Sequence, residues 1–149
     1  MGKTPLLFYE GTLDAPAYRK LLVQALPAMK KLFRGKPGWI FQHDGASAHK
    51  AAATNEWLKK NVPKFITSGP SGVWPANSPD LNWIENIWGI MAARLEDYES
   101  LPDSVEEFKS RVLKEWDSIS VVTLKKCAAS MPDRLRLVIQ QKGEALRDY

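Results

Sequence analysis

The sequence predicts an α/β fold, because short apolar runs alternate with segments in which apolar residues recur at helical spacing. Two such runs, Pro5–Tyr9 and Gly38–Phe41, are each followed by a helical pattern, as in strand–helix units. A third, weaker strand is expected at Lys64–Thr67. The chain has 149 residues, of which 44% are hydrophobic, and this is enough for one domain with a sizeable core.

The first helix should begin after Asp14, a residue type that caps helices, with Pro16 tolerated in the first turn. Apolar residues recur at helical spacing from Tyr18 to Phe33 and predict one buried stripe. Pro27 lies inside this stripe. We expect it to kink the helix or to divide it in two.

The second strand carries the first candidate for chemistry at its end. Gly38–Phe41 is apolar on both faces, as in a central strand, and Asp44 lies just past its carboxyl end, where ligands bind in open α/β sheets. A helix is expected from about Ser47 to Asn61. The segment Thr67–Asn77 is rich in Gly, Pro and Ser and predicts a loop.

Helices should occupy the rest of the chain. One is expected to begin near Ser78 or Asn82, and the next follows a capping box formed by Ser104 and Glu107. The last helical region should run from about Val121 to Gln141, with an interruption at Met131-Pro132. The apolar stripe expected to be buried behind the capping box consists of Val105, Phe108, Val112, Trp116 and Ile119.

Composition limits the classes of function. The single Cys127 excludes an internal disulfide, two scattered histidines give no zinc pattern, and no apolar run is long enough for a signal peptide or a membrane span. A reducing compartment is therefore expected. The net charge of +4 is uneven: residues 1–64 carry eleven Lys and Arg against four Asp and Glu, whereas residues 65–149 carry ten against thirteen. This basic half suits a polyanionic partner or is simply a solvated face.

Two motifs place acids where metals bind. Asp44 lies in Gln42–His49, just past a strand, and Glu85 lies in Trp74–Trp88, in the first turn of a helix. Carboxylates delivered from different elements hold Mg²⁺ ions over a phosphodiester, although two acids form an incomplete set for two metals. Each acid also has a local explanation, because Asp44 fits an ordinary turn and Glu85 fits a capping box with Asn82.

Four blocks, taken together, resemble the catalytic domain of mariner-like transposases. They follow one another in the order found in that family and span essentially the whole chain: Gly2–Tyr18, Gln42–His49, Trp74–Trp88 and Ser130–Gly143. The resemblance implies a ribonuclease H-like fold with strand order 3-2-1-4-5. It also implies transposition of DNA with two Mg²⁺ or Mn²⁺ ions, in which Asp44 is the second catalytic acid and Glu85 the third.

The resemblance also implies that the first acid lies upstream of Gly2. Residues 1–149 are therefore expected to be a partial catalytic domain, truncated at its N-terminal side, without a helix-turn-helix domain and inactive alone. In the implied sheet, the missing first strand would lie between Pro5–Tyr9 and Gly38–Phe41. These two strands should then pair directly, exchange between copies, or leave a reduced three-stranded layer.

The expected partners are transposon ends and target DNA, with a homodimer or larger assembly of the full-length protein, in the nucleus if the source is eukaryotic and otherwise in the cytoplasm. Candidate DNA contacts are His49, Lys50, Trp74 and Trp83. A histidine on an alanine-rich helix is more often a structural hydrogen-bonding residue. The family usually has Pro where Trp83 stands, so the start of that helix is expected to differ.

Two further functions remain open. The chain could be a non-enzymatic DNA- or protein-binding remnant that keeps the fold after losing catalysis. It could also be a related integrase or nuclease of the same fold that acts on other DNA ends. An upstream reading frame that encodes paired helix-turn-helix segments and an Asp on a strand would favour the transposase over both of these alternatives.

Overall fold

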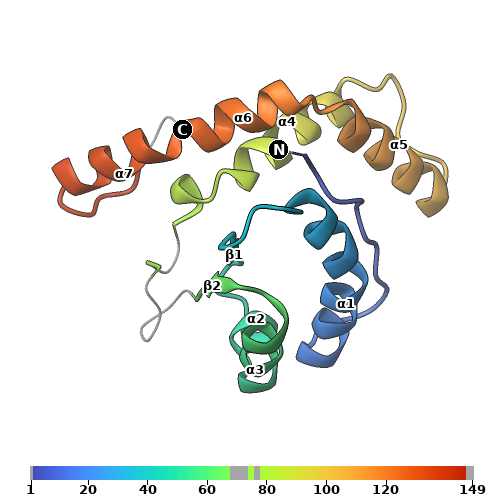
Figure 1. Ribbon diagram of the computed structural model, residues 1–149. Helices are drawn as coiled ribbons and strands as arrows, with labels where there is room; N and C mark the ends of the chain where they lie inside the picture. The colour runs from blue at the N-terminus through green and yellow to red at the C-terminus, as the bar shows by residue number, and fades with distance from the viewer. Residues whose placement is uncertain (1, 68–73, 76–77, 147–149) are drawn as a thin grey trace. The chain divides into compact units, whose positions relative to one another are not determined.

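A computed structural model describes residues 2–67, 74–75 and 78–146 of the chain (Figure 1). These residues belong to two compact units, one formed by Lys3–Asn77 and the other by Met1–Gly2 with Ser78–Tyr149. Asp44 lies in the first unit and Glu85 in the second.

The first unit is a two-stranded parallel sheet with three helices. Its strands pair in the register Ile40 with Lys64, Phe41 with Phe65 and Gln42 with Ile66. Because the strands are parallel, both begin at one end of the sheet and both finish at the other. The elements, in chain order, are α1 (Ala15–Leu32), β1 (Ile40–Gln42), α2 (Ser47–Lys50), α3 (Ala52–Asn61) and β2 (Lys64–Ile66).

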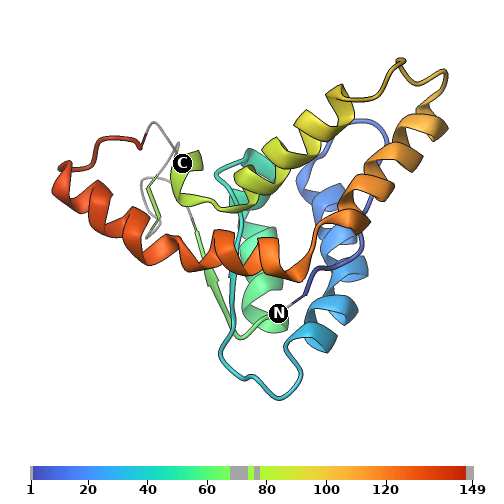
Figure 2. The same cartoon turned by 90° about the horizontal axis from the view of Figure 1, so that it is seen from above.

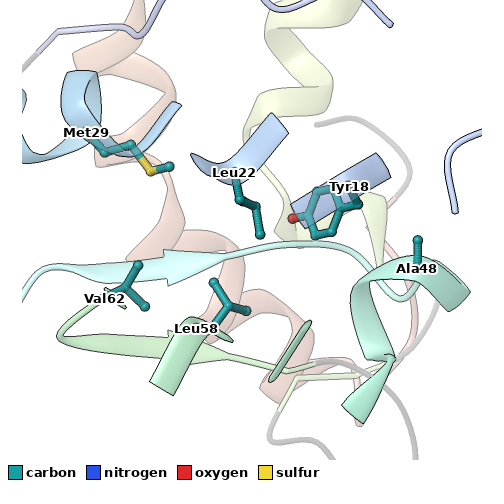
Figure 3. Close-up of a cluster of buried hydrophobic side chains, with 6 residues drawn as sticks. All are labelled: Tyr18, Leu22, Met29, Ala48, Leu58 and Val62. Carbon is teal, nitrogen blue, oxygen red and sulfur yellow. The ribbon is translucent and has the colours of Figure 1, made fainter. Parts of the chain in front are cut away.

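The core of this unit runs along β1 from one end to the other (Figure 3). Met29 and Val62 lie near the start of β1, and Tyr18 and Ala48 lie toward its other end. Leu58 is fully buried between these two pairs, opposite Leu22 of α1. The helical stripe predicted for α1 therefore packs on the sheet, and its first turn lies beside the segment that carries Asp44.

The limits of α1 follow local rules. Asp14 caps the helix as predicted, since its Oδ1 accepts a hydrogen bond of 2.8 Å from the Ala17 backbone N–H. The helix continues through Pro27, so the prediction that Pro27 divides it is wrong. A proline removes the hydrogen bond to the carbonyl four residues earlier, on Val23. Val23 is 54% exposed, so this hydrogen bond is lost at the surface of the helix rather than in the core.

Two of the predicted elements of the first unit are not formed as expected. Pro5–Tyr9 is not a strand, and the side chains of its last three residues are exposed. A strand needs a partner, and in the described part of the chain β1 pairs with β2 alone. Of the three expected arrangements, direct pairing of Pro5–Tyr9 with Gly38–Phe41 and the three-stranded layer are therefore wrong. The helix expected over Ser47–Asn61 is two helices, because Ala51 has an extended backbone (φ −56°, ψ 136°).

The second unit is helical, and in Figure 2 α4 and α5 lie side by side, joined by a loop. Trp116 and Ile119 of the predicted α5 stripe are buried, but Val105 and Phe108 are exposed, so the stripe is buried only in its second half. No described helix is long and apolar enough to cross a membrane. The elements are the 3₁₀ helix η1 (Pro79–Leu81), α4 (Ile84–Glu96), α5 (Val105–Ser118), α6 (Val121–Ala129) and α7 (Met131–Gln140).

The observed ends of these helices agree only partly with the ends predicted from the sequence. The Glu107 N–H donates to Ser104 Oγ at 3.1 Å, as predicted, but the Glu107 carboxylate accepts from the N–H of Asp103 rather than from that of Ser104. Helix α4 begins at Ile84, after a separate 3₁₀ turn. The expected loop Thr67–Asn77 lies mostly outside the described residues.

Candidate functional site

Asp44 is an exposed acid at the carboxyl end of β1. Its Oδ1 accepts a hydrogen bond of 2.9 Å from the Ala46 N–H, which forms the turn between β1 and α2. This turn is the local role that the sequence allowed for Asp44. The side chain is nonetheless 62% exposed, and every described contact of the carboxylate is made by Oδ1. No described contact involves Oδ2, and a side chain this exposed is accessible to a ligand.

His49 is the second partner of the same carboxylate oxygen. Its Nδ1 lies 2.5 Å from Asp44 Oδ1, the length of an ion-pair contact, although the nitrogen has no hydrogen bond of regular geometry. The His49 side chain is only 13% exposed. Its ring lies 3.9 Å from the Tyr18 ring, centroid to centroid, and 5.1 Å from that of His43. His49 thus connects the exposed acid to a group of enclosed rings.

Behind His49 lies a buried pair of polar rings. Tyr18 Oη is 3.3 Å from His43 Nδ1, and both side chains are buried. Burial lowers the pKa of His43 to about 4, helped by the nearby His49 and opposed by Asp44. Burial also raises the pKa of Tyr18, and the negative charge of Asp44 adds to that effect. Both groups are therefore neutral near pH 7.

Glu85 is an exposed acid in the first turn of α4, where its charge interacts favourably with the helix dipole. Its Oε1 accepts a 3.2 Å hydrogen bond from the side-chain amide of Asn82. The expected capping box would have used the Asn82 backbone N–H instead. The residue at the start of the helix is Trp83, whose φ of −60° is the value that a proline would have. The start of the helix thus has a backbone geometry that a proline would also fit.

Arg134 of α7 holds the segment before Glu85. The residue is only 4% exposed. Its guanidinium donates to the Asp80 carbonyl oxygen at 2.8 Å and to Asn86 Oδ1 at 2.7 Å. Its Nε donates to Ser130 Oγ at 2.9 Å. Asp80 Oδ2 in turn accepts from the Leu146 N–H at 2.9 Å. One buried guanidinium therefore fixes η1 and the first turn of α4 to α7.

The other predicted DNA-contact residues differ in their exposure to solvent. Lys50 is exposed at the end of α2, whereas Trp74 and Trp83 are half-buried. The Trp74 N–H donates to the Thr67 carbonyl oxygen at 3.2 Å. Among the described residues, no group of three or more His, Cys, Asp or Glu side chains is arranged to hold a metal ion.

Three residues that the sequence did not single out shape the two acids' surroundings. In the sequence, Tyr18 was only one member of an apolar stripe, His43 was one of two scattered histidines, and Arg134 was part of a matching block. Tyr18 and His43 are 25 positions apart, and Arg134 is 48 positions from Asn86. No local pattern in the sequence reports contacts at such separations.

Comparison with known families shows where the chain belongs. The family model described as DDE superfamily endonuclease matches residues 2–109. The chain is a member of this family. The match covers both Asp44 and Glu85, together with α1, the sheet and α4.

Its curated relatives are transposases. The chain is 29% identical to the Tc3 transposase of Caenorhabditis elegans over 97% of its own length and 42% of that protein. It is 27% identical to the Tcb1 transposase of Caenorhabditis briggsae over 93% of its length and 48% of that protein. The chain thus spans less than half the length of these relatives. The mariner-like transposase family predicted from the sequence is confirmed.

Solved structures of similar shape belong to the catalytic domain of Mos1 mariner transposase. One was determined with raltegravir and Mn and has a TM-score of 0.73 and 21% identity, covering 92% of this chain and 67% of that one. Another has a TM-score of 0.75 and 20% identity, covering 92% and 66%. These matches confirm the predicted ribonuclease H-like fold.

Proposed function

We propose that this chain is part of the catalytic domain of a transposase that cuts and joins DNA strands, with Asp44 and Glu85 each serving as a ligand for Mg²⁺ or Mn²⁺. The observation that carries the proposal is that, in a member of the DDE family, both acids are exposed and each is oriented through one oxygen, by Ala46 for Asp44 and by Asn82 for Glu85. The other oxygen of each has no described partner.

The donor set fits the metal. Mg²⁺ and Mn²⁺ prefer carboxylate oxygens, and Asp44 Oδ2 is accessible at the end of a strand, where the backbone is fixed. Bound metals would activate water or a 3′-hydroxyl as the nucleophile and stabilise the leaving oxygen of the scissile phosphate. The protein holds Asp44 with Ala46 and His49, and it holds Glu85 with Asn82 and the segment that Arg134 fixes.

The set of acids needs at least one further carboxylate, because a two-metal centre uses a bridging ligand as well as terminal ones. Asp80 is a poor candidate, since it is buried and its Oδ2 is occupied by the Leu146 N–H. Glu10 is exposed but lies in irregular structure. We infer that the remaining acid belongs to a segment outside residues 1–149, and that residues 1–149 alone cleave transposon ends poorly.

The proposed substrates are transposon ends and target DNA, with Lys50, Trp74 and Trp83 as candidate contacts. Since the chain spans less than half the length of its curated relatives, the assembly is a property of the longer protein, for which we propose a homodimer or larger oligomer acting in the nucleus of a eukaryote.

Mn²⁺ titration followed by NMR tests the metal proposal. If each acid is a metal ligand, the backbone amide signals around Asp44 and those around Glu85 should broaden as Mn²⁺ is added. Asp44→Asn should remove the broadening around residue 44, and Glu85→Gln should remove the broadening around residue 85. The matched controls Glu56→Gln in α3 and Glu96→Gln in α4 remove exposed acids from the same two units and should leave it intact. Broadening around either acid that survives its own substitution would contradict its assignment as a metal ligand.

A cleavage assay tests the inference about the missing ligand. Residues 1–149 should show little Mg²⁺-dependent cleavage of transposon ends, because a centre without all of its carboxylates stabilises the transition-state charge poorly. Robust cleavage that disappears in Asp44→Ala would show that an acid within residues 1–149 completes the site. Glu10 would then be the first residue to test.

A further inference from the structure

Basic side chains of the first unit gather at the end of the sheet opposite Asp44. No Asp or Glu occurs between Asp14 and Asp44 in the sequence. The segment that leads into β1 carries Arg34 and Lys36, and β2 begins with Lys64, which pairs in register with the first residue of β1. Because the strands are parallel, both of these segments lie at the end where the strands begin, whereas Asp44 follows the end where β1 finishes.

Part of this charge has a structural explanation. Lys30 and Lys31 lie in the last turn of α1, and Lys59 and Lys60 lie in the last turn of α3, where cations stabilise the helix dipole. Three further basic residues at this end of the sheet lie outside the helices: Arg34, Lys36 and Lys64. All three are exposed, and in the part of the chain that the structure describes none has an ion-pair partner. Helix stability does not account for them.

The segment that carries Arg34 and Lys36 is locally ordered. The rings of Phe33 and Trp39, one on each side of it, stack with centroids 5.0 Å apart and an angle of 11° between their planes. The Lys36 N–H donates to the Phe33 carbonyl oxygen at 2.9 Å, and Gly35 turns the chain with a φ of 74°. These contacts hold the two cations on a fixed turn, which lowers the entropy lost when they bind a partner.

The core residues that precede these two basic segments lie at the same end of the cluster in Figure 3. They are Met29, near the end of α1, and Val62, which closes α3 just before β2. Both belong to the buried core of the first unit. The exposed cations that follow Met29 and Val62 in the sequence are therefore carried by the same end of that core.

We propose that this basic end, made of Lys30, Lys31, Arg34, Lys36, Lys60 and Lys64, binds the phosphate backbone of duplex DNA. The one acid in α3, Glu56, is already paired with Lys59 at 2.7 Å, so it does not offset the cations. Exposed cations on a turn and at helix ends contact phosphates and carry no base-specific pattern, so the binding is independent of sequence. The inference rests on the proposed function only in its choice of DNA as the polyanion. The basic end would hold a DNA segment other than the one at Asp44.

The salt dependence of binding tests the proposal. Fluorescence anisotropy with a short duplex of random sequence, in EDTA, measures affinity without any metal centre. Each lost phosphate contact lowers the slope of log K against log salt concentration by about 0.9, so the triple variant Arg34→Gln, Lys36→Gln, Lys64→Gln should lower it by about 2 to 3. The matched triple Lys125→Gln, Lys126→Gln, Lys142→Gln removes the same charge from exposed sites of the second unit and should lower it by less than about 1.

Lysine acetylation of the unsubstituted chain provides a second measurement that does not depend on how the variants fold. Duplex DNA should protect Lys36 and Lys64 and leave Lys125 and Lys126 reactive. Equal slope changes in the two triples, absence of protection at Lys36, or tighter binding to anionic lipid vesicles than to DNA would each overturn the proposal. Because EDTA removes the metal, a failure of metal binding at Asp44 or at Glu85 would leave these results unchanged.

Discussion

At the scale of single residues, the side chains of Tyr18 and His43, buried behind Asp44, add no charge of their own. The buried pair Tyr18 and His43 carries no net charge near pH 7, since burial raises the pKa of Tyr18 and lowers that of His43 to about 4. Only His49 contacts the carboxylate from this side, and it uses Oδ1. The rings therefore support the position of Asp44 and leave Oδ2 available for a cation.

The motifs around the two acids could be recognised from the sequence, because each acid is local to a strand end or a helix start. The residues that support the two acids could not be recognised from the sequence. Tyr18 and Arg134 act through contacts with residues far away in the sequence, and an aromatic residue on an apolar stripe or an arginine on a helix has many more common roles. Their function depends on tertiary packing, which periodicity does not encode.

The pKa of His43 predicts that stability depends on pH in metal-free buffer. Its pKa is about 4 when folded and about 6.5 when unfolded, so between these values the unfolded chain binds more protons. The free energy of unfolding should therefore rise by on the order of 2 to 3 kcal/mol as the pH rises from about 4 to about 6.5. Urea titrations across this range measure it. His43→Asn should flatten the curve, and an unchanged slope in that variant would contradict the assignment.

Replacing Arg134 should loosen the start of α4. In Arg134→Met the Asp80 carbonyl and the Asn86 side chain lose their buried donor, and the free energy of unfolding of the second unit should fall by about 2 to 4 kcal/mol. Arg136→Met, on the same helix but exposed and paired only with Asp133, should cost less than about 1 kcal/mol. Hydrogen exchange of the α4 amides is the measurement. Equal effects of the two substitutions would show that Arg134 does not hold this segment.

At the scale of elements, local rules identified helix starts better than helix breaks. Asp14 and Ser104 were predicted as caps, and each accepts a backbone hydrogen bond. The break at Ala51 was not predicted, because alanine is the strongest helix former. The break is stabilised by side chains instead: Thr54 Oγ1 donates to the Ala48 carbonyl oxygen at 2.9 Å, and Asn55 Nδ2 donates to that of Lys50 at 3.1 Å.

The break between α2 and α3 should depend on Thr54, which is fully buried. Thr54→Val keeps the shape of the side chain but removes its donor, so the Ala48 carbonyl loses its hydrogen bond, at a cost of about 1 to 3 kcal/mol. Thr54→Ser keeps the donor and loses a methyl group, at a cost of about 1 kcal/mol. Thermal unfolding compares them. A larger loss in Thr54→Ser than in Thr54→Val would show that packing, rather than the hydrogen bond, maintains the break.

At the scale of the whole molecule, the α/β class could be predicted because β1, β2 and the helices follow local patterns of apolar residues. The strand predicted at Pro5–Tyr9 failed because a strand forms only with a partner, and pairing is a long-range property. Helical elements satisfy their backbone groups internally, whereas a strand leaves one row of donors and acceptors for a neighbour. In the described part of the chain, β1 finds that neighbour on one side only.

The open edge of β1 predicts that the chain self-associates. An unpaired strand edge is a template for pairing with another copy, and Ile40, at the start of β1, is 55% exposed. Ile40→Lys should lower the association measured by sedimentation velocity over a range of concentrations, because a charge on an edge strand opposes pairing. It should change the free energy of unfolding by no more than about 0.5 kcal/mol, since the side chain is largely in water. Ile139→Lys adds the same charge to an exposed position of α7 and should leave association unchanged. If the unsubstituted chain is a monomer at every concentration, with slow and concentration-independent exchange of amides 40–42, then β1 does not act as an open edge.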